Sequence, residues 1–226
     1  MKYYKLRTDY NPKITGKANG GCAVELKDKQ SFGSIEDKYL WKDYCTQNRI
    51  NMNNHSSCEN YIPFDYQLLK APLRCFLTGK RVKELDFMTF APYIHGIQFL
   101  VSEKAYNVIK RYRLQTHNAI PVQIDTLKQT YYLLGFPIVG FSYFDFSCSL
   151  FYNYCSKSKE QIANEETYSN LFKEGCVDTV LIKLKSKFEV DIIHTPGASY
   201  FSAELLSDLK KENVTGYIQY DERLDN

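Results

Sequence analysis

The chain has 226 residues, of which 44% are hydrophobic, and its 29 basic and 26 acidic residues give a formal net charge of +3. That apolar content excludes a disordered chain, and the length suffices for one large domain or two small ones. The near balance of charge, with only short basic runs, disfavours the clustered basic face of a nucleic-acid-binding protein. Aromatic residues reach 15%, with 19 tyrosines, which is typical of β-rich packing.

The cysteines indicate neither a disulfide framework nor a zinc site, because their number is odd, their spacing is irregular and no CxxC pair occurs. We expect reduced thiols and no bound metal or cofactor. The stretch Met1–Arg7 has no apolar signal core, and no apolar run is long enough for a membrane span. The sequence therefore predicts a cytoplasmic protein with no membrane partner. The seven cysteines are Cys22, Cys45, Cys58, Cys75, Cys148, Cys155 and Cys176.

The N-terminal part begins with a predicted strand over Lys2–Arg7. Ser34 is a suitable N-cap for a helix over Ile35–Gln47, since acidic residues follow in its first turn. The polar, asparagine-rich stretch Asn48–Asn60 then predicts an exposed loop.

The central part carries the clearest helix, over Ser102–Tyr112, with apolar residues at helical spacing. Two strands joined by a short loop follow, over Ile120–Ile124 and Thr130–Leu134. Pro121 lacks a backbone donor, so it predicts an edge position or a strand start for the first of them. The aromatic stretch Phe141–Tyr152 is a third β candidate.

The C-terminal part begins with a predicted surface helix over Lys157–Lys173. Apolar and charged residues then alternate over Val180–Ile192, which indicates one strand, or a hairpin kept in register through Ser186, with one buried face. A second capped helix starts at Ser202, and a last strand covers Val214–Ile218. Together the elements predict a single α+β domain with an antiparallel or mixed sheet and helices packed mainly on one side. The alternative division is an N-terminal subregion of residues 1–75 joined to a core region of residues 76–226.

One short phrase occurs twice. Gln98-Phe99-Leu100-Val101-Ser102-Glu103-Lys104 and Ser199-Tyr200-Phe201-Ser202-Ala203-Glu204-Leu205 each place an aromatic residue shortly before a serine at a predicted helix start. Serine at this position accepts a hydrogen bond from the first turn of the helix. The phrase is too short to establish an internal duplication, so we interpret it as a shared capping solution.

Catalytic patterns are weak. None of the four histidines is paired at helical spacing, and no GxSxG motif surrounds a serine. The main catalytic alternative is a Cys–His pair, in which Cys148 or Cys176 meets His117 or His194 in the fold.

Three residues are candidates for a binding surface, namely Asp145, Tyr143 and His117. Asp145 is a charge within the aromatic stretch Tyr143-Phe144-Asp145-Phe146-Ser147, where it either faces water or is a partnered acid at a binding surface. His117 precedes a predicted strand, and a hydrogen-bonded turn residue is the favoured interpretation over a general base.

Several of these motifs keep one order along roughly residues 80 to 220. They are Phe99–Lys104, His117, Pro121, Tyr131–Leu134, Phe144–Ser147, Phe201-Ser202, Leu205 and Thr215–Tyr217. The chain in this region resembles the bacterial immunity proteins of polymorphic toxin systems, in particular immunity protein family forty-three and its relative, family eleven. The resemblance implies a cytosolic, non-enzymatic inhibitor that binds a cognate toxin protein. The near-neutral net charge differs from that of a strongly acidic inhibitor that would occupy the basic cleft of a nuclease. A small hydrolase or transferase and a general protein-interaction module are the alternatives.

Overall fold

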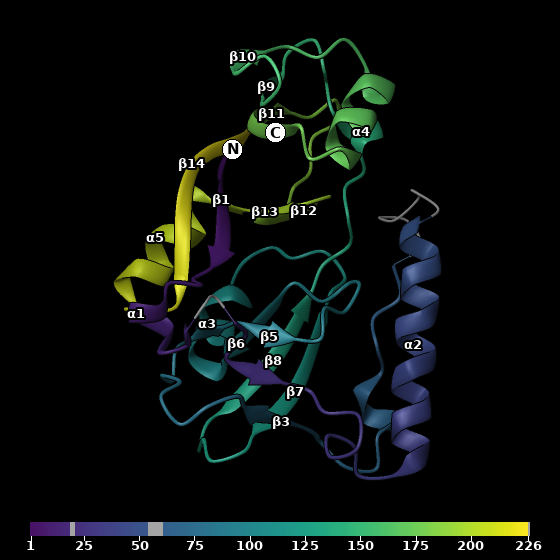
Figure 1. Ribbon diagram of the computed structural model, residues 1–226, viewed down its shortest axis with the longest axis vertical. Coiled ribbons are helices and arrows are strands. Elements are labelled where there is room, and N and C mark those ends of the chain that lie inside the picture. Colours follow the sequence, from purple (N-terminus) through teal and green to yellow (C-terminus); the bar gives the residue numbers. More distant parts are fainter. Residues whose placement is uncertain (19–20, 54–60, 226) are drawn as a thin grey trace.

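The computed structural model describes residues 1–18, 21–53 and 61–225. Within them, strands form two mixed seven-stranded sheets, which lie one above the other in Figure 1. The first sheet has the order β4 (Phe87–Met88), β6 (Phe99–Ser102), β8 (Thr130–Gly135), β7 (Asn118–Ile124), β3 (Leu73–Leu77), β2 (Val24–Glu25), β5 (Phe90–Ala91). The second sheet has the order β12 (Ile192–Thr195), β13 (Ala198–Ser202), β1 (Lys2–Thr8), β14 (Tyr217–Asp225), β11 (Val177–Lys183), β9 (Leu150–Asn153), β10 (Ser158–Glu160).

The two sheets repeat one arrangement. In each sheet order as given, each of the first four strands is antiparallel to its neighbour among them. The fifth strand is parallel to the fourth, and the sixth is antiparallel to the fifth. A helix follows the second strand in both cases, α3 (Glu103–Ile109) after β6 and α5 (Ala203–Lys211) after β13. We call β3, β4, β6, α3, β7 and β8 the first repeat, and β11, β12, β13, α5, β14 and β1 the second repeat. The third strand of the second repeat is β1, which precedes the whole first repeat in the sequence.

The register of β13 with β1 matches that of β6 with β8 residue by residue. Ser102 lies opposite Tyr131 in the first repeat, and Ser202 lies opposite Tyr3 in the second. The segment Tyr3-Tyr4-Lys5-Leu6 therefore corresponds to Tyr131-Tyr132-Leu133-Leu134. The doubled helix entry is thus part of a repeated strand-helix arrangement that extends well beyond a shared cap.

The repeats are also joined reciprocally. The Asp86 carboxylate, just before β4, accepts hydrogen bonds from the backbone and hydroxyl of Thr215, which follows α5. The Asp191 carboxylate, just before β12, accepts from the backbone of Arg113, which follows α3. Each buried aspartate therefore fixes the segment after the other repeat's helix. Serine caps begin both helices as predicted, since Ser102 accepts from the backbone of Ala105 and Ser202 accepts from that of Leu205.

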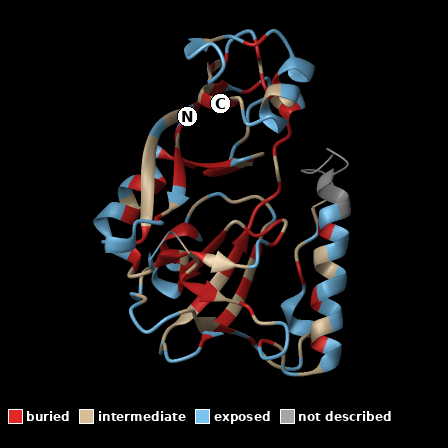
Figure 2. Ribbon diagram, viewed as in Figure 1, coloured by how far each residue is buried: buried red, intermediate tan, exposed pale blue. Residues whose placement is uncertain are grey.

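Three hydrophobic clusters hold the layers together. The central cluster contains residues of both sheets and of α3 and α5, including an edge-to-face contact of Phe99 with Phe201. A second cluster lies on the other face of the first sheet, where Trp41 of α2 (Ile35–Asn53) packs. A third lies on the other face of the second sheet, beneath Tyr168 of α4 (Glu165–Lys173). Figure 2 shows the buried residues concentrated along the strands and on one side of each helix.

The predicted α+β class is confirmed, with mixed sheets. The helices cover both faces of the sheets instead of mainly one, because α2 and α3 pack on opposite sides of the first sheet. The boundary considered near residue 75 falls inside β3, and residues before it supply strands to both sheets. Short helical turns complete the structure: α1 (Pro12–Thr15), η2 (Tyr66–Leu68) and η3 (Phe141–Tyr143).

Several predicted elements differ from the structure. The expected strand over 141–152 is the η3 turn followed by β9, because the Asp145 carboxylate accepts from the Ser147 backbone and closes a turn. The alternating segment 180–192 spans β11 and β12, which occupy separate places in the second sheet, so it is neither one strand nor a hairpin. The helix expected over 157–173 begins only at α4, since Ser158–Glu160 pair with β9. Pro121 lies inside β7, which is not an edge strand, and pairing with β3 starts one residue later.

Candidate binding cleft between the two repeats

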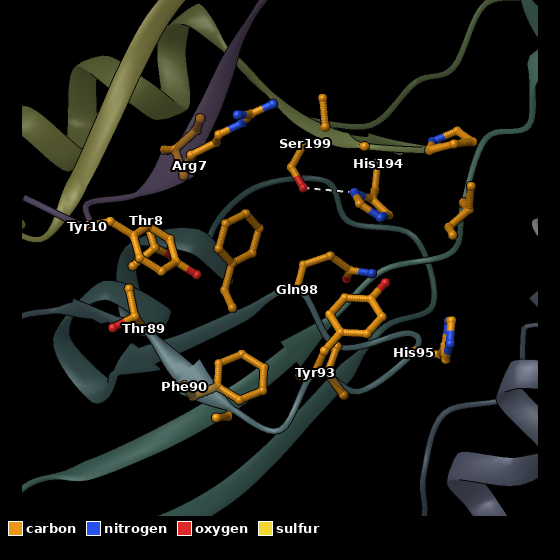
Figure 3. Close-up of a pocket in the computed structure, with 18 of the residues that line it drawn as sticks. Arg7, Thr8, Tyr10, Thr89, Phe90, Tyr93, His95, Gln98, His194 and Ser199 are labelled. Atoms are coloured by element: carbon orange, nitrogen blue, oxygen red, sulfur yellow. Dashed lines mark hydrogen bonds between the residues drawn. The ribbon is translucent and has the colours of Figure 1, made fainter. Parts of the chain in front are cut away.

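A cleft of about 780 Å³ opens between the two sheets, at the strand ends opposite α3 and α5. The first repeat and the neighbouring β5 supply one wall, which includes Phe90, Tyr93 and Phe99. The second repeat supplies the other, which includes Arg7, His194 and Ser199 (Figure 3). A cleft of this size lies in the range of natural ligand-binding sites, which are mostly apolar with a few placed polar groups.

The matched registers show which cleft residues are peculiar to one repeat. Because Ile192 and Phe87 are equivalent, His194 takes the place of Thr89 in the first repeat. By the same alignment Ser199 takes the place of Phe99, and Arg7 that of Gly135. The framework of the two repeats is shared, but the side chains at these three positions differ: Ser199 and Arg7 replace the non-polar Phe99 and Gly135, and the His194 imidazole replaces the Thr89 hydroxyl. These positions are therefore not required by the common fold.

His194 and Ser199 are cross-strand neighbours on β12 and β13. The His194 Nδ1 lies 2.9 Å from the Ser199 Oγ, which is the hydrogen bond drawn in Figure 3. Burial lowers the pKa of His194 to about 4, while a backbone hydrogen bond at Ala198 acts in the opposite direction. The imidazole is therefore neutral at pH 7, and a neutral ring carries one donor and one acceptor nitrogen.

The charge of the cleft has one sign. Arg7 and Lys173 line it, and no aspartate or glutamate occurs among the described residues that do so. The Arg7 guanidinium lies 5.9 Å from the ring centroid of Tyr220. Within the described part of the chain, no carboxylate forms an ion pair with either cation. Because Leu6 is the cross-strand neighbour of Ser199, the Arg7 side chain leaves β1 on the face opposite to Ser199.

Exposed aromatic rings lie at the rim of the cleft. Tyr93 is 75% exposed and makes an edge-to-face contact with the His95 ring at 5.1 Å, and Tyr10 is 50% exposed. Figure 3 shows Tyr93 and Gln98 facing the wall that carries His194 and Ser199. Exposed tyrosines around a cavity are typical of protein interfaces, because each ring offers a large contact area and a polar end.

The three candidate binding residues from the sequence lie outside the lining of this cleft. His117 stacks on Phe136 in the first sheet, and its Nδ1 lies 2.9 Å from the Gln115 carbonyl oxygen, as expected for a hydrogen-bonded turn residue. Tyr143 packs against Phe188, at the side of the second sheet. Asp145 lies two residues further on, in its turn. The structure thus brings Tyr143 and Asp145 to one region and places His117 in another.

Asp145 has a local structural partner. Its carboxylate accepts hydrogen bonds from the Ser147 backbone and hydroxyl. The hydroxyl bond is the main reason why the pKa of Asp145 lies below its usual value. Its flanking residues Phe144 and Phe146 are buried, in agreement with the predicted alternation.

The residues considered for a Cys–His pair have other neighbours. Cys148 lies beside the Ser147 hydroxyl, and the Cys176 thiol donates to the Glu174 carbonyl oxygen. The six described cysteines are all free thiols, and Cys58 lies outside the described residues. Across the described ranges, no group of three histidine, cysteine or acidic side chains could hold a metal ion.

Sequence reasoning missed Arg7 and Ser199 as site residues and considered His194 only as the partner of a cysteine, although Ser199 begins the second copy of the doubled phrase. A scan of protein-family models and searches of curated proteins and solved structures found no match to this chain. Among the described residues, no helix has the length and apolar character needed to cross a membrane.

Proposed function

We propose that this protein is a binding protein that receives a segment of a protein partner in the cleft between its two repeats. The observation that carries the proposal is the cleft itself, whose lining side chains His194 and Ser199 differ from Thr89 and Phe99 at the equivalent positions of the other repeat. The exposed rings of Tyr93 and Tyr10 at its rim support a protein partner. The resemblance to immunity proteins makes that partner a bacterial toxin domain, which binding neutralises in the cytoplasm.

The test is co-expression with the C-terminal toxin domain encoded by a neighbouring gene. We expect the two proteins to co-purify and the growth of the toxin-producing cells to be restored. Tyr93→Ala should weaken both effects. Tyr39→Ala is the matched control, because Tyr39 is similarly exposed, at 64%, but lies on α2 away from the cleft. Absence of a complex and of growth rescue with the wild-type protein would reject the proposal.

A hydrolase or transferase has less support from the geometry. The cysteine that lines the cleft is Cys22, and burial raises the pKa of its thiol. Burial also lowers the pKa of His194. Both effects favour neutral groups, whereas a Cys–His nucleophile requires a thiolate. Rapid, selective alkylation of one cysteine with loss of a turnover reaction would favour the enzyme. A general interaction module would have no toxin gene nearby.

A further inference from the structure

We propose that Cys155 and Cys176 form a modification site, at which exchange with a low-molecular-weight disulfide joins the two thiols in a reversible intramolecular disulfide. The cross-link fastens the C-terminal end of α4 to the turn between β9 and β10. This inference goes beyond the proposed function, because neither cysteine lines the cleft and no partner protein is needed for the reaction.

The first argument is the position of the two residues on neighbouring segments of backbone. β9 and β11 pair in antiparallel register, with Asn153 opposite Val177. The Tyr154 amide donates to the Cys176 carbonyl oxygen at 2.8 Å, so Cys176 is bonded to the residue that precedes Cys155. Neighbouring strands lie about 4.8 Å apart, within the α-carbon separation of about 4.4–6.8 Å that a disulfide requires. In Figure 1 these strands, β10 and α4 form one end of the molecule.

The second argument is the contact between the two side chains. The chain leaves β9 after Asn153, so Cys155 lies in a turn and does not follow the alternation of the strand. A hydrogen bond joins the two thiol groups, and it is the main reason why the pKa of the Cys176 thiol is raised. Cys155 is exposed and Cys176 is half-buried, so a small oxidant can reach the pair.

The third argument is that separate backbone contacts hold both residues in place. The Cys155 amide donates to the Asn153 side-chain oxygen at 2.9 Å, which closes the turn after β9. The Cys176 amide donates to the Leu171 carbonyl oxygen at 2.8 Å, which closes the C-terminal end of α4. The disulfide therefore joins two segments that already lie in position, and it encloses β10 and α4 in one covalent loop.

The reaction is a thiol–disulfide exchange in two steps. The Cys155 thiol loses its proton and attacks one sulfur of the small disulfide, which releases one small thiol and leaves a mixed disulfide on Cys155. Cys176 then attacks the Cys155 sulfur, and its proton leaves with the second small thiol. The two protein thiols are oxidised and the small disulfide is reduced to two thiols. Cys155 exchanges first, because the raised pKa of Cys176 keeps that thiol protonated.

Helix α4 connects this site with the cleft. Ser169, Phe172 and Lys173 of α4 line the cleft, and the Phe172 ring makes an edge-to-face contact with Phe141 of the same lining at 5.3 Å. Cys176 follows directly after the turn that ends this helix. The disulfide consequently restrains the part of the cleft wall that α4 supplies.

The test treats the full chain with glutathione disulfide and then alkylates the remaining thiols under denaturing conditions. Mass spectrometry should show a main product with two fewer alkyl groups than the reduced protein and no bound glutathione. Chymotrypsin cleaves after Tyr152 and Tyr154 and so separates Cys148 from Cys155. The digest should contain a linked pair of peptides that carry Cys155 and Cys176. A main product with another cysteine pair, with glutathione on Cys155 or with a link between two copies would overturn the proposal.

The matched control is Cys148→Ser, because Cys148 is also exposed but has the Ser147 hydroxyl as its neighbour. This variant should form the cross-link to the same extent as the wild type. Cys176→Ser should instead retain glutathione on Cys155, because the thiol required for the second step is missing. Loss of the cross-link in Cys148→Ser, or the absence of a glutathione adduct on Cys155 in Cys176→Ser, would overturn the assignment.

Hydrogen exchange measures the restraint on α4. The amides of Glu165–Lys173 should exchange at least ~3-fold more slowly in the oxidised wild type than in the reduced protein, because local opening of the helix is restricted. Dithiothreitol should restore the faster exchange, and Cys155→Ser should show no difference between the two treatments. Equal exchange in the oxidised and reduced wild type would overturn the restraint, whatever the outcome of the toxin co-expression.

Discussion

Tyr3 and Tyr131 make the same tertiary hydrogen bond in the two repeats. The Tyr3 hydroxyl donates to the Val190 carbonyl oxygen at 2.6 Å, and the Tyr131 hydroxyl donates to the Leu85 carbonyl oxygen at 3.0 Å. Each acceptor immediately precedes one of the two buried aspartates that link the repeats. The same junction is therefore built twice, once with a strand from the middle of the sequence and once with β1.

Removal of either hydroxyl should destabilise the protein to a similar extent. Tyr3→Phe and Tyr131→Phe each remove the donor from the carbonyl oxygen of a half-buried residue, at a cost of about 1 kcal/mol in the free energy of unfolding. Urea denaturation followed by circular dichroism measures the change. Tyr39→Phe, at an exposed position, is the control and should be neutral. A large effect of one substitution and none of the other would contradict the equivalence of the two junctions.

The two serine caps should differ in their contribution to stability. Ser102 accepts from the Ala105 backbone and also donates to the Asp86 carboxylate at 2.6 Å, whereas the Ser202 hydroxyl has only the cap contact with the Leu205 backbone among the described residues. Ser202→Ala should cost about 1 kcal/mol, the usual value of an N-cap. Ser102→Ala should cost about 2–3 kcal/mol, because it also removes a hydrogen bond from a buried carboxylate.

The caps should be measured by the same urea denaturation in a single buffer. Thr167→Ala provides a control on a helix whose cap is a different residue, since Asn164 caps α4. Equal costs at Ser102 and Ser202 would show that the hydrogen bond to Asp86 adds nothing to the stability of the first repeat.

Local features were predictable from the sequence, and nonlocal pairing was not. The helix cap at Ser102 and the hairpin of β7 and β8 follow from patterns within a few residues, and both occur in the structure. The equivalent positions of Tyr3 and Tyr131 are visible in the sequence as the pairs Tyr3-Tyr4 and Tyr131-Tyr132. A search for a repeat of fixed period does not find this equivalence, because β8 follows β7 in the chain, whereas its equivalent β1 precedes β14.

The cleft could not be predicted from local sequence patterns, because the residues that line it come from segments far apart in the chain. His194 and Ser199 meet across the ladder of β12 and β13, and Arg7 comes to the same region because β1 inserts between β13 and β14. The sequence around His194 does not identify its cross-strand partner until the strand register is known. By contrast, Asp145 attracted attention as a charge among aromatic residues, and its partner is the nearby Ser147.

The pKa of His194 predicts a loss of stability in mild acid. In the unfolded chain the imidazole takes up a proton near its ordinary pKa of 6.5, whereas in the folded protein it does so only near about 4. The unfolded state therefore binds more protons between these values, and stability falls as pH decreases from about 6.5 to about 4, by at most on the order of 3 kcal/mol. Above pH 7 this contribution is constant.

The matched variant for this effect is His194→Asn, whose amide can still bond Ser199 but does not titrate. The free energy of unfolding should fall less steeply with decreasing pH in the variant than in the wild type. Carboxylates with lowered pKa values, such as Asp28 and Asp208, also lose stabilising charge in acid, but they do so equally in both proteins. Parallel pH profiles would contradict the assigned neutral state of His194.

The place of β1 predicts that a circular permutant folds. Lys2 pairs with Asp225 in the antiparallel ladder of β1 and β14, so these two ends of the strands are adjacent. In the first repeat the equivalent residues are Thr130 and Gln123, which are joined directly by the loop between β7 and β8. A linker of about four residues between 226 and 1 would reproduce the length of that loop.

We would open the permuted chain between Lys17 and Ala18, after β1, so that β1 follows β14 as β8 follows β7. The permutant should retain the circular dichroism spectrum and a single cooperative urea transition, because no strand pairing is lost. Deletion of residues 1–8 is the complementary experiment. It removes the strand between β13 and β14 and with it Tyr3 and Leu6 of two core clusters, and it should abolish cooperative unfolding. A deletion variant with the wild-type transition would show that β1 is not required to complete the second repeat.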